Sequence, residues 1–101
     1  MGLTIELQTE LGRMIQRVTD PTNILHKLLP SANDESSRCL RFIDWYGDTT
    51  FNELQMDEFL REWTALYSDA NTDETTLLRQ VESLAQICRD GHHRYLKFIG
   101  D

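Results

Sequence analysis

Cysteine and histidine near the end of the chain are the residue types best suited to chemistry. Cys88 and His92 are four residues apart, a spacing that places a thiolate and an imidazole on one face of a helix. Both groups are common zinc ligands, but a tetrahedral site needs four, and the other candidates, His26 and Cys39, are distant in the sequence. We therefore expect Cys39 and Cys88 to be buried, reduced thiols, with no bound metal or cofactor. Zinc binding by Cys88 and His92, and a disulfide between the cysteines, remain alternatives.

A second candidate for chemistry is His26. Residues 25–32, Leu-His-Lys-Leu-Leu-Pro-Ser-Ala, resemble the phospho-accepting segment of histidine phosphotransfer domains, which are acidic helical bundles of similar size. The family places a lysine three residues after the histidine and a glycine next, whereas this chain has Leu29 and Pro30 there. The resemblance implies a phosphotransfer role for His26, which is our alternative function.

Paired carboxylates occur at helical spacing but do not form an acid–base pattern. Glu6 and Glu10 form one pair, Glu58 and Glu62 another, and each pair has an arginine nearby. Such charges are typical of solvated helix faces. The sequence also lacks a Glu-x-x-His pair, a glycine-rich phosphate loop and a G-x-S-x-G turn. We therefore do not expect an enzyme.

Composition indicates one globular domain over residues 1–101. Apolar residues make up 40% of the chain and charged residues 27%, the balance of a folded domain. No apolar run approaches the roughly 20 residues that span a membrane, and the start of the chain does not have the pattern of a secretory signal. We expect a cytoplasmic protein.

Negative charge is concentrated in the middle of the chain. The net charge is −7, and residues 44–74 carry nine acids against the single base Arg61. Repulsion from this acidic stretch argues against nucleic acid or an anionic membrane as the partner. A protein with a basic surface is the partner that it would attract.

The last quarter of the chain has the widest apolar face. Residues 73–99 place an apolar sector over about half of a helical circumference, wider than an ordinary surface helix. We predict one long helix, against which the rest of the chain packs. Its apolar phase continues across Gly91, so the helix either continues there or bends.

Helical spacing also predicts the earlier elements, namely helices over residues 4–18, 21–29, 34–46 and 50–68. Thr50 and Glu53 have the spacing of a helix-capping box. The predicted fold is all-α, an antiparallel bundle of four main helices and one short helix, 21–29. The predicted core contains Leu11, Met14, Val18, Leu28, Cys39, Phe42, Ile43, Phe59, Leu60, Trp63, Leu77, Val81, Leu84 and Cys88.

These features predict a non-enzymatic protein-binding or regulatory module. Its binding surface would be the acidic side of the helices over 34–46 and 50–68, with a homodimer as a possible assembly. Phe51 and Leu54 lie off the apolar stripe of the second of these helices, so they either staple its first turn or form an exposed patch. The expected binding residues are Trp45, Phe51, Leu54, Asp57, Glu58 and Glu62.

Overall fold

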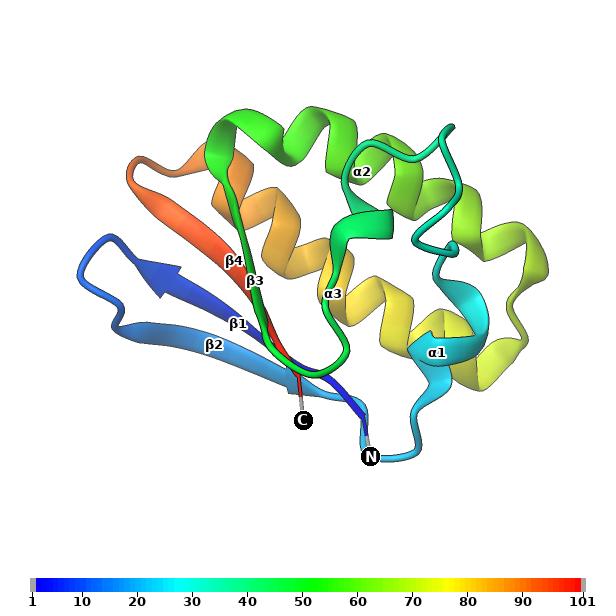
Figure 1. The fold of residues 1–101 in the computed structure, drawn as a ribbon. Helices are drawn as coiled ribbons and strands as arrows, with labels where there is room; N and C mark the ends of the chain where they lie inside the picture. Colours follow the sequence, from blue (N-terminus) through cyan, green and yellow to red (C-terminus); the bar gives the residue numbers. More distant parts are fainter. Residues whose placement is uncertain (1, 101) are drawn as a thin grey trace.

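The computed structural model describes residues 2–100 and shows an α+β fold, so the predicted all-α helical bundle is wrong. Four antiparallel strands form one sheet in the order β2-β1-β4-β3. The helices lie together against one face of this sheet and leave its other face open (Figure 1). The strands are β1 (Thr4–Thr9), β2 (Met14–Thr19), β3 (Asp48–Asn52) and β4 (Arg94–Ile99).

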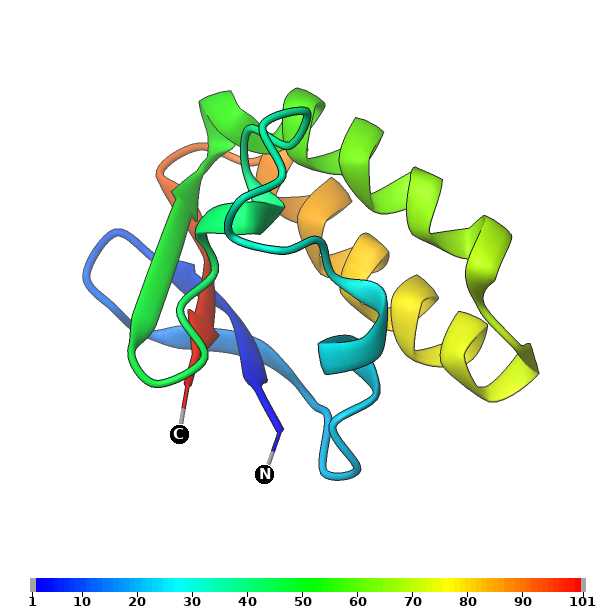
Figure 2. The same ribbon diagram turned by 45° about the vertical axis from the view of Figure 1, so that its right-hand side comes forward.

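Three α-helices and three short 3-10 helices make up the second layer. The two longer helices, α2 and α3, run side by side across the sheet (Figures 1 and 2). The α-helices are α1 (Ile24–Leu28), α2 (Met56–Ala65) and α3 (Thr72–Asp90), and the 3-10 helices are η1 (Leu40–Phe42), η2 (Glu53–Gln55) and η3 (Leu66–Asp69).

The predicted helix over residues 4–18 is instead the β1–β2 hairpin. Ile5 and Leu7 are fully buried in the core, while Gln8 lies on the open face, the alternation expected of a strand covered on one side. Gly12 adopts φ +83° in the hairpin loop, a conformation that costs other residues free energy. Glycine at this place therefore favours a turn over a continuing helix.

The predicted long helix over 73–99 is also wrong in its final third. α3 ends at Asp90, with the Gly91 N–H bonded to the Ile87 carbonyl. The chain then reverses and enters β4, where Leu96 and Phe98 face the core. Pairing with β1 satisfies the β4 backbone and buries these two side chains on the sheet's covered face. Gly91 therefore marks a helix end, not a kink.

The two middle helices of the prediction are only partly present. Within 34–46 the one regular element is η1, and Thr50 belongs to β3. The capping box in this region uses Asn52 and Gln55, so the Thr50–Glu53 box is wrong. α2 buries four residues of the apolar stripe predicted for 50–68, namely Met56, Phe59, Leu60 and Trp63. The predicted short helix is present as α1, whose first two N–H groups bond to the Asp20 carboxylate.

The core lies between the sheet and the helices. Phe59 stacks on Trp63 with ring centroids 5.3 Å apart, and the Trp63 indole donates to the Leu78 carbonyl at 2.9 Å. Five predicted core residues are not buried: Leu11, Met14 and Phe42 are exposed, and Val18 and Leu28 are only partly buried. The remaining predicted core residues are buried, namely Cys39, Ile43, Phe59, Leu60, Trp63, Leu77, Val81, Leu84 and Cys88.

Across residues 2–100, no helix has both the length and the apolar character that crossing a bilayer requires.

Candidate functional site

The acidic stretch 44–74 forms β3, α2 and the start of α3, and several of its carboxylates hold the fold together. Glu74 is buried, caps α3 through the Asn71 N–H and forms an ion pair with Lys27 of α1. Asp48 pairs with Lys97 at 3.4 Å, and Glu53 accepts a hydrogen bond from the His93 N–H. These acids have structural partners and contribute less free charge than the sequence implies.

Glu62 has the most contacts of these carboxylates. Its carboxylate accepts hydrogen bonds from the Ser37 hydroxyl at 2.6 Å and from the N–H groups of Arg38, Cys39 and Leu40 at 2.7 to 3.0 Å. Burial raises the pKa of Glu62, but these hydrogen bonds outweigh burial and hold the pKa below its usual range. The carboxylate therefore fastens the segment before η1 to α2.

The exposed apolar side chains of this region come from the segments directly before and after β3 in the sequence. Phe42 and Tyr46, in the segment before β3, expose 58% and 87% of their surface, and Leu54, in η2 after it, exposes 88%. Large apolar side chains at such exposure are common anchors of protein interfaces. We call Phe42, Asp44, Tyr46, Leu54, Asp57 and Glu58 the β3-edge surface.

The β3-edge surface occupies one margin of the sheet. β3 is an edge strand, and the segment containing η1 runs beside it, with the start of α2 at its far end (Figure 2). The five residues of β3, a length of about 17 Å, lie between Tyr46 and Leu54. Asp44 and Asp57 are exposed next to these anchors, and Glu58 is partly exposed. The arrangement combines apolar anchors with negative charge.

Besides Glu62, which is bonded within the fold, two of the predicted binding residues lie outside the β3-edge surface. Phe51 points into the core, 3% exposed, with its ring 5.3 Å from Phe59 and 5.9 Å from Phe98. Trp45 is half-buried against the His26 ring, at a centroid separation of 5.0 Å. Neither side chain is as accessible as Leu54, so the predicted pair Phe51 and Leu54 is divided between the core and the surface.

Sequence reasoning missed Phe42 and Tyr46 as surface residues. Helical spacing over 34–46 places Phe42 and also Tyr46 on the inner face of a helix, but the structure contains no such helix. The run Asp44-Trp45-Tyr46-Gly47 had a usable signal, because aspartate followed three residues later by glycine is typical of a turn. Asp44 does accept the Tyr46 N–H at 2.9 Å within this bend.

The cysteine and histidine residues do not come together as a ligand set. The Cys88 thiol donates to the Arg94 carbonyl at 3.4 Å, and His92 is exposed beyond the end of α3. Within residues 2–100 no group of three potential ligands is close enough to hold a metal ion. Cys39 and Cys88 are free thiols, and burial, aided by nearby glutamates, raises the pKa of each to about 11. Both thiols are therefore poor nucleophiles at neutral pH.

The open sheet face carries a polar network centred on Glu6. Glu6 accepts hydrogen bonds from the Gln8 amide at 2.8 Å and from two Arg17 nitrogens at 3.0 and 2.8 Å. The Gln8 bond lowers the pKa of Glu6 most, and Arg17 also lowers it, against the opposite effect of burial. Glu6 is therefore a charged structural group, not a poised acid or base.

Comparison of the chain with protein-family models, curated proteins and solved structures finds no match.

Proposed function

We propose that this protein is a non-enzymatic binding module that engages a basic surface of another protein through the β3-edge surface. The observation that carries the proposal is the exposure of Phe42, Tyr46 and Leu54 in a part of the chain that also has exposed acids. Apolar anchors would supply the buried contact area, and the acids would attract the partner and select its charge. Asp44 and Asp57 supply that charge, because Glu62 and Glu74 are already bonded within the protein.

The β3-edge surface fits within a protein interface of standard size. A standard interface covers about 800 Å² on each partner, which is enough to include anchors about 17 Å apart. The net charge of −7 would also accelerate encounter with a basic protein at low salt. A cytoplasmic location is part of the proposal, and the two unbonded cysteines agree with it.

Affinity capture with quantitative mass spectrometry tests this proposal. The wild-type protein is compared with Tyr46→Ala/Leu54→Ala, which removes two anchors, and with Asp57→Lys/Glu58→Lys, which reverses the adjacent charge. Asp69→Lys/Asp73→Lys is the matched control, because it makes the same charge change at exposed positions near another helix start.

The expected result is a basic protein recovered by the wild type and the control, and reduced at least tenfold by both β3-edge variants. The recovered protein is then purified and its affinity for each variant measured directly. Equal affinity for the wild type and the two β3-edge variants would contradict the proposal.

The alternative function, phosphotransfer through His26, came from the resemblance of residues 25–32 to a family of helical bundles, and this protein is not a helical bundle. His26 lies in the five-residue helix α1 and its ring packs against Trp45. No contact of this side chain favours phosphoryl transfer, so we do not propose that function.

A further inference from the structure

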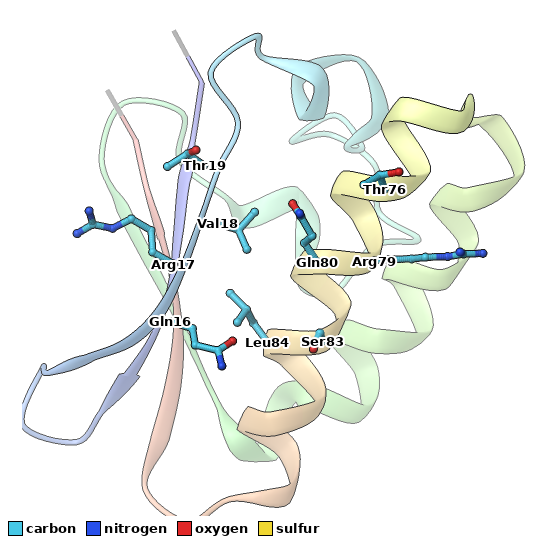
Figure 3. Close-up of a pocket in the computed structure, with 9 residues that line it drawn as sticks. All are labelled: Gln16, Arg17, Val18, Thr19, Thr76, Arg79, Gln80, Ser83 and Leu84. Atoms are coloured by element: carbon cyan, nitrogen blue, oxygen red, sulfur yellow. The ribbon is translucent and has the colours of Figure 1, made fainter.

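The opposite edge of the sheet also has a distinct surface, formed by β2 and α3. An open groove of about 710 Å³ separates the two elements. Figure 3 shows Gln16 and Val18 of β2 and Gln80 and Leu84 of α3 directed into the space between the strand and the helix. The side chains that line the groove are Gln16, Arg17, Val18, Thr19, Thr76, Arg79, Gln80, Ser83 and Leu84.

The backbone of β2 is available for pairing along this groove. β2 is an edge strand whose one neighbour in the sheet is β1, and the Asp20 N–H bonds to the Leu3 carbonyl at 3.0 Å. Bonded and non-bonded pairs alternate along an antiparallel ladder. Arg17 and Thr19 therefore direct their N–H and C=O groups away from β1, toward any strand added beside β2.

Two arginines beside the groove favour an acidic occupant. Its lining contains two arginines and no carboxylate, in a protein whose net charge is −7. Arg17 and Arg79 point away from the centre of the groove on either side of it (Figure 3). Arg17 gives Glu6 two of its hydrogen bonds and keeps a half-exposed side chain, so its remaining N–H groups are free to meet a carboxylate.

We propose that the groove binds an extended acidic segment of another protein, which adds to β2 as a fifth strand. Main-chain bonds to Arg17 and Thr19 would hold the segment, as in other cases of strand addition. Side chains of a strand alternate between its faces, so those toward α3 would be small, apolar or hydroxyl-bearing to fit against Gln16, Val18 and Gln80. The alternate side chains would be Asp or Glu beside Arg17.

A second copy of this chain is a poorer occupant on the same grounds. Pairing two β2 strands would place Arg17 of both copies along one seam, and β2 contributes no acid to it. Like charges on adjacent strands destabilise pairing. An acidic strand instead supplies opposite charges at these positions.

Selection from a random heptapeptide phage library tests the inference with the intact protein as bait. The expected peptides carry Asp or Glu at alternate positions with small or apolar residues between them. Addition of a selected peptide to labelled protein should shift the amide resonances of Arg17 and Thr19 together with those of Thr76 and Gln80.

Two variants and a control locate the binding. Thr19→Pro removes an N–H that points outward, a place where an edge strand tolerates proline, and Gln80→Trp fills the groove from α3. Each should weaken peptide binding at least tenfold. Gln86→Trp makes the same change at an exposed α3 position outside the groove lining and should bind as the wild type does.

Three results would contradict the binding of an acidic segment beside β2. Failure to enrich acidic peptides, or equal binding by the wild type and Gln80→Trp, would overturn the inference. Self-association that Thr19→Pro abolishes would show a second copy on β2 and would also overturn it. The test is independent of the proposed function, because Asp57→Lys/Glu58→Lys leaves this groove unchanged and should bind the peptides normally.

Discussion

Phe51 and Leu54 are three residues apart but have opposite roles. Phe51→Ala should destabilise the protein by about 3–5 kcal/mol, since it removes a buried ring and leaves a cavity. Leu54→Ala should change stability by less than about 0.5 kcal/mol, because the side chain is in water. Urea unfolding of both variants measures the difference, and similar losses of stability would contradict the assigned burial.

Glu62 should make the stability of the protein sensitive to acid. Its folded pKa is lowered from an ordinary value of 4.5, so its contribution to stability is present above about pH 4.5 and lost as pH falls through the folded pKa. Glu62→Gln should cost about 1–3 kcal/mol at pH 7, and the difference from wild type should shrink at pH 3.

Urea unfolding at the two pH values measures this change. Glu58→Gln is the control, because Glu58 pairs with the exposed Arg61 and such pairs contribute about 0–1 kcal/mol. A Glu62→Gln deficit of the same size at both pH values would contradict the role given to the carboxylate.

At the scale of elements, Asp20 fixes the start of α1 directly after β2. The buried Asp20 carboxylate accepts the N–H groups of Ile24 and Leu25, both at 2.8 Å. Asp20→Ala should destabilise the protein by about 1–2 kcal/mol, since it leaves two amides without acceptors. Asp20→Asn should recover part of this loss because one oxygen remains. A neutral Asp20→Ala in thermal unfolding would contradict the cap.

The sequence predicts α2 and most of α3 because their apolar residues recur over several turns. Met56, Phe59, Leu60 and Trp63 follow spacings of three, four and seven residues, which fit a helix and not a strand. The capping boxes at Asn52 and Asn71 each lie within two residues of a predicted helix start.

The strands could not be separated from helices by the same reasoning. Residues four apart share a face in both structures, so the spacing of Leu7 and Leu11, or of Met14 and Val18, fits either. Spacing by two distinguishes a strand, as in Leu96 and Phe98, but each strand offers only five or six residues for that pattern. Pairing between β1 and β4, which are distant in sequence, then decides the fold.

The candidate site was predictable to the extent that it depended on local charge. Asp57 and Glu58 were identified from the acidic stretch and are at least partly exposed, as is Leu54. Phe42 and Tyr46 were missed because their exposure depends on a segment that Glu62 holds in place from 22 or more residues away. A contact of that range leaves no periodic signal in the sequence.

At the scale of the whole molecule, the sheet separates two surfaces of different character. The β3-edge surface combines apolar anchors with acids, whereas the groove at β2 is lined mainly by polar side chains, two of them arginines. The sheet order places β2 and β3 at opposite edges. Two partners of opposite charge could therefore bind the protein at the same time.

Hydroxyl-radical footprinting of the complex with the captured basic protein tests the proposed function most directly. The account predicts that Phe42, Tyr46 and Leu54 become protected. Leu11 and Met14 on the β1–β2 hairpin, which are 83% and 49% exposed, should keep their reactivity. Protection of Leu11 and Met14, with Phe42, Tyr46 and Leu54 still reactive, would contradict it.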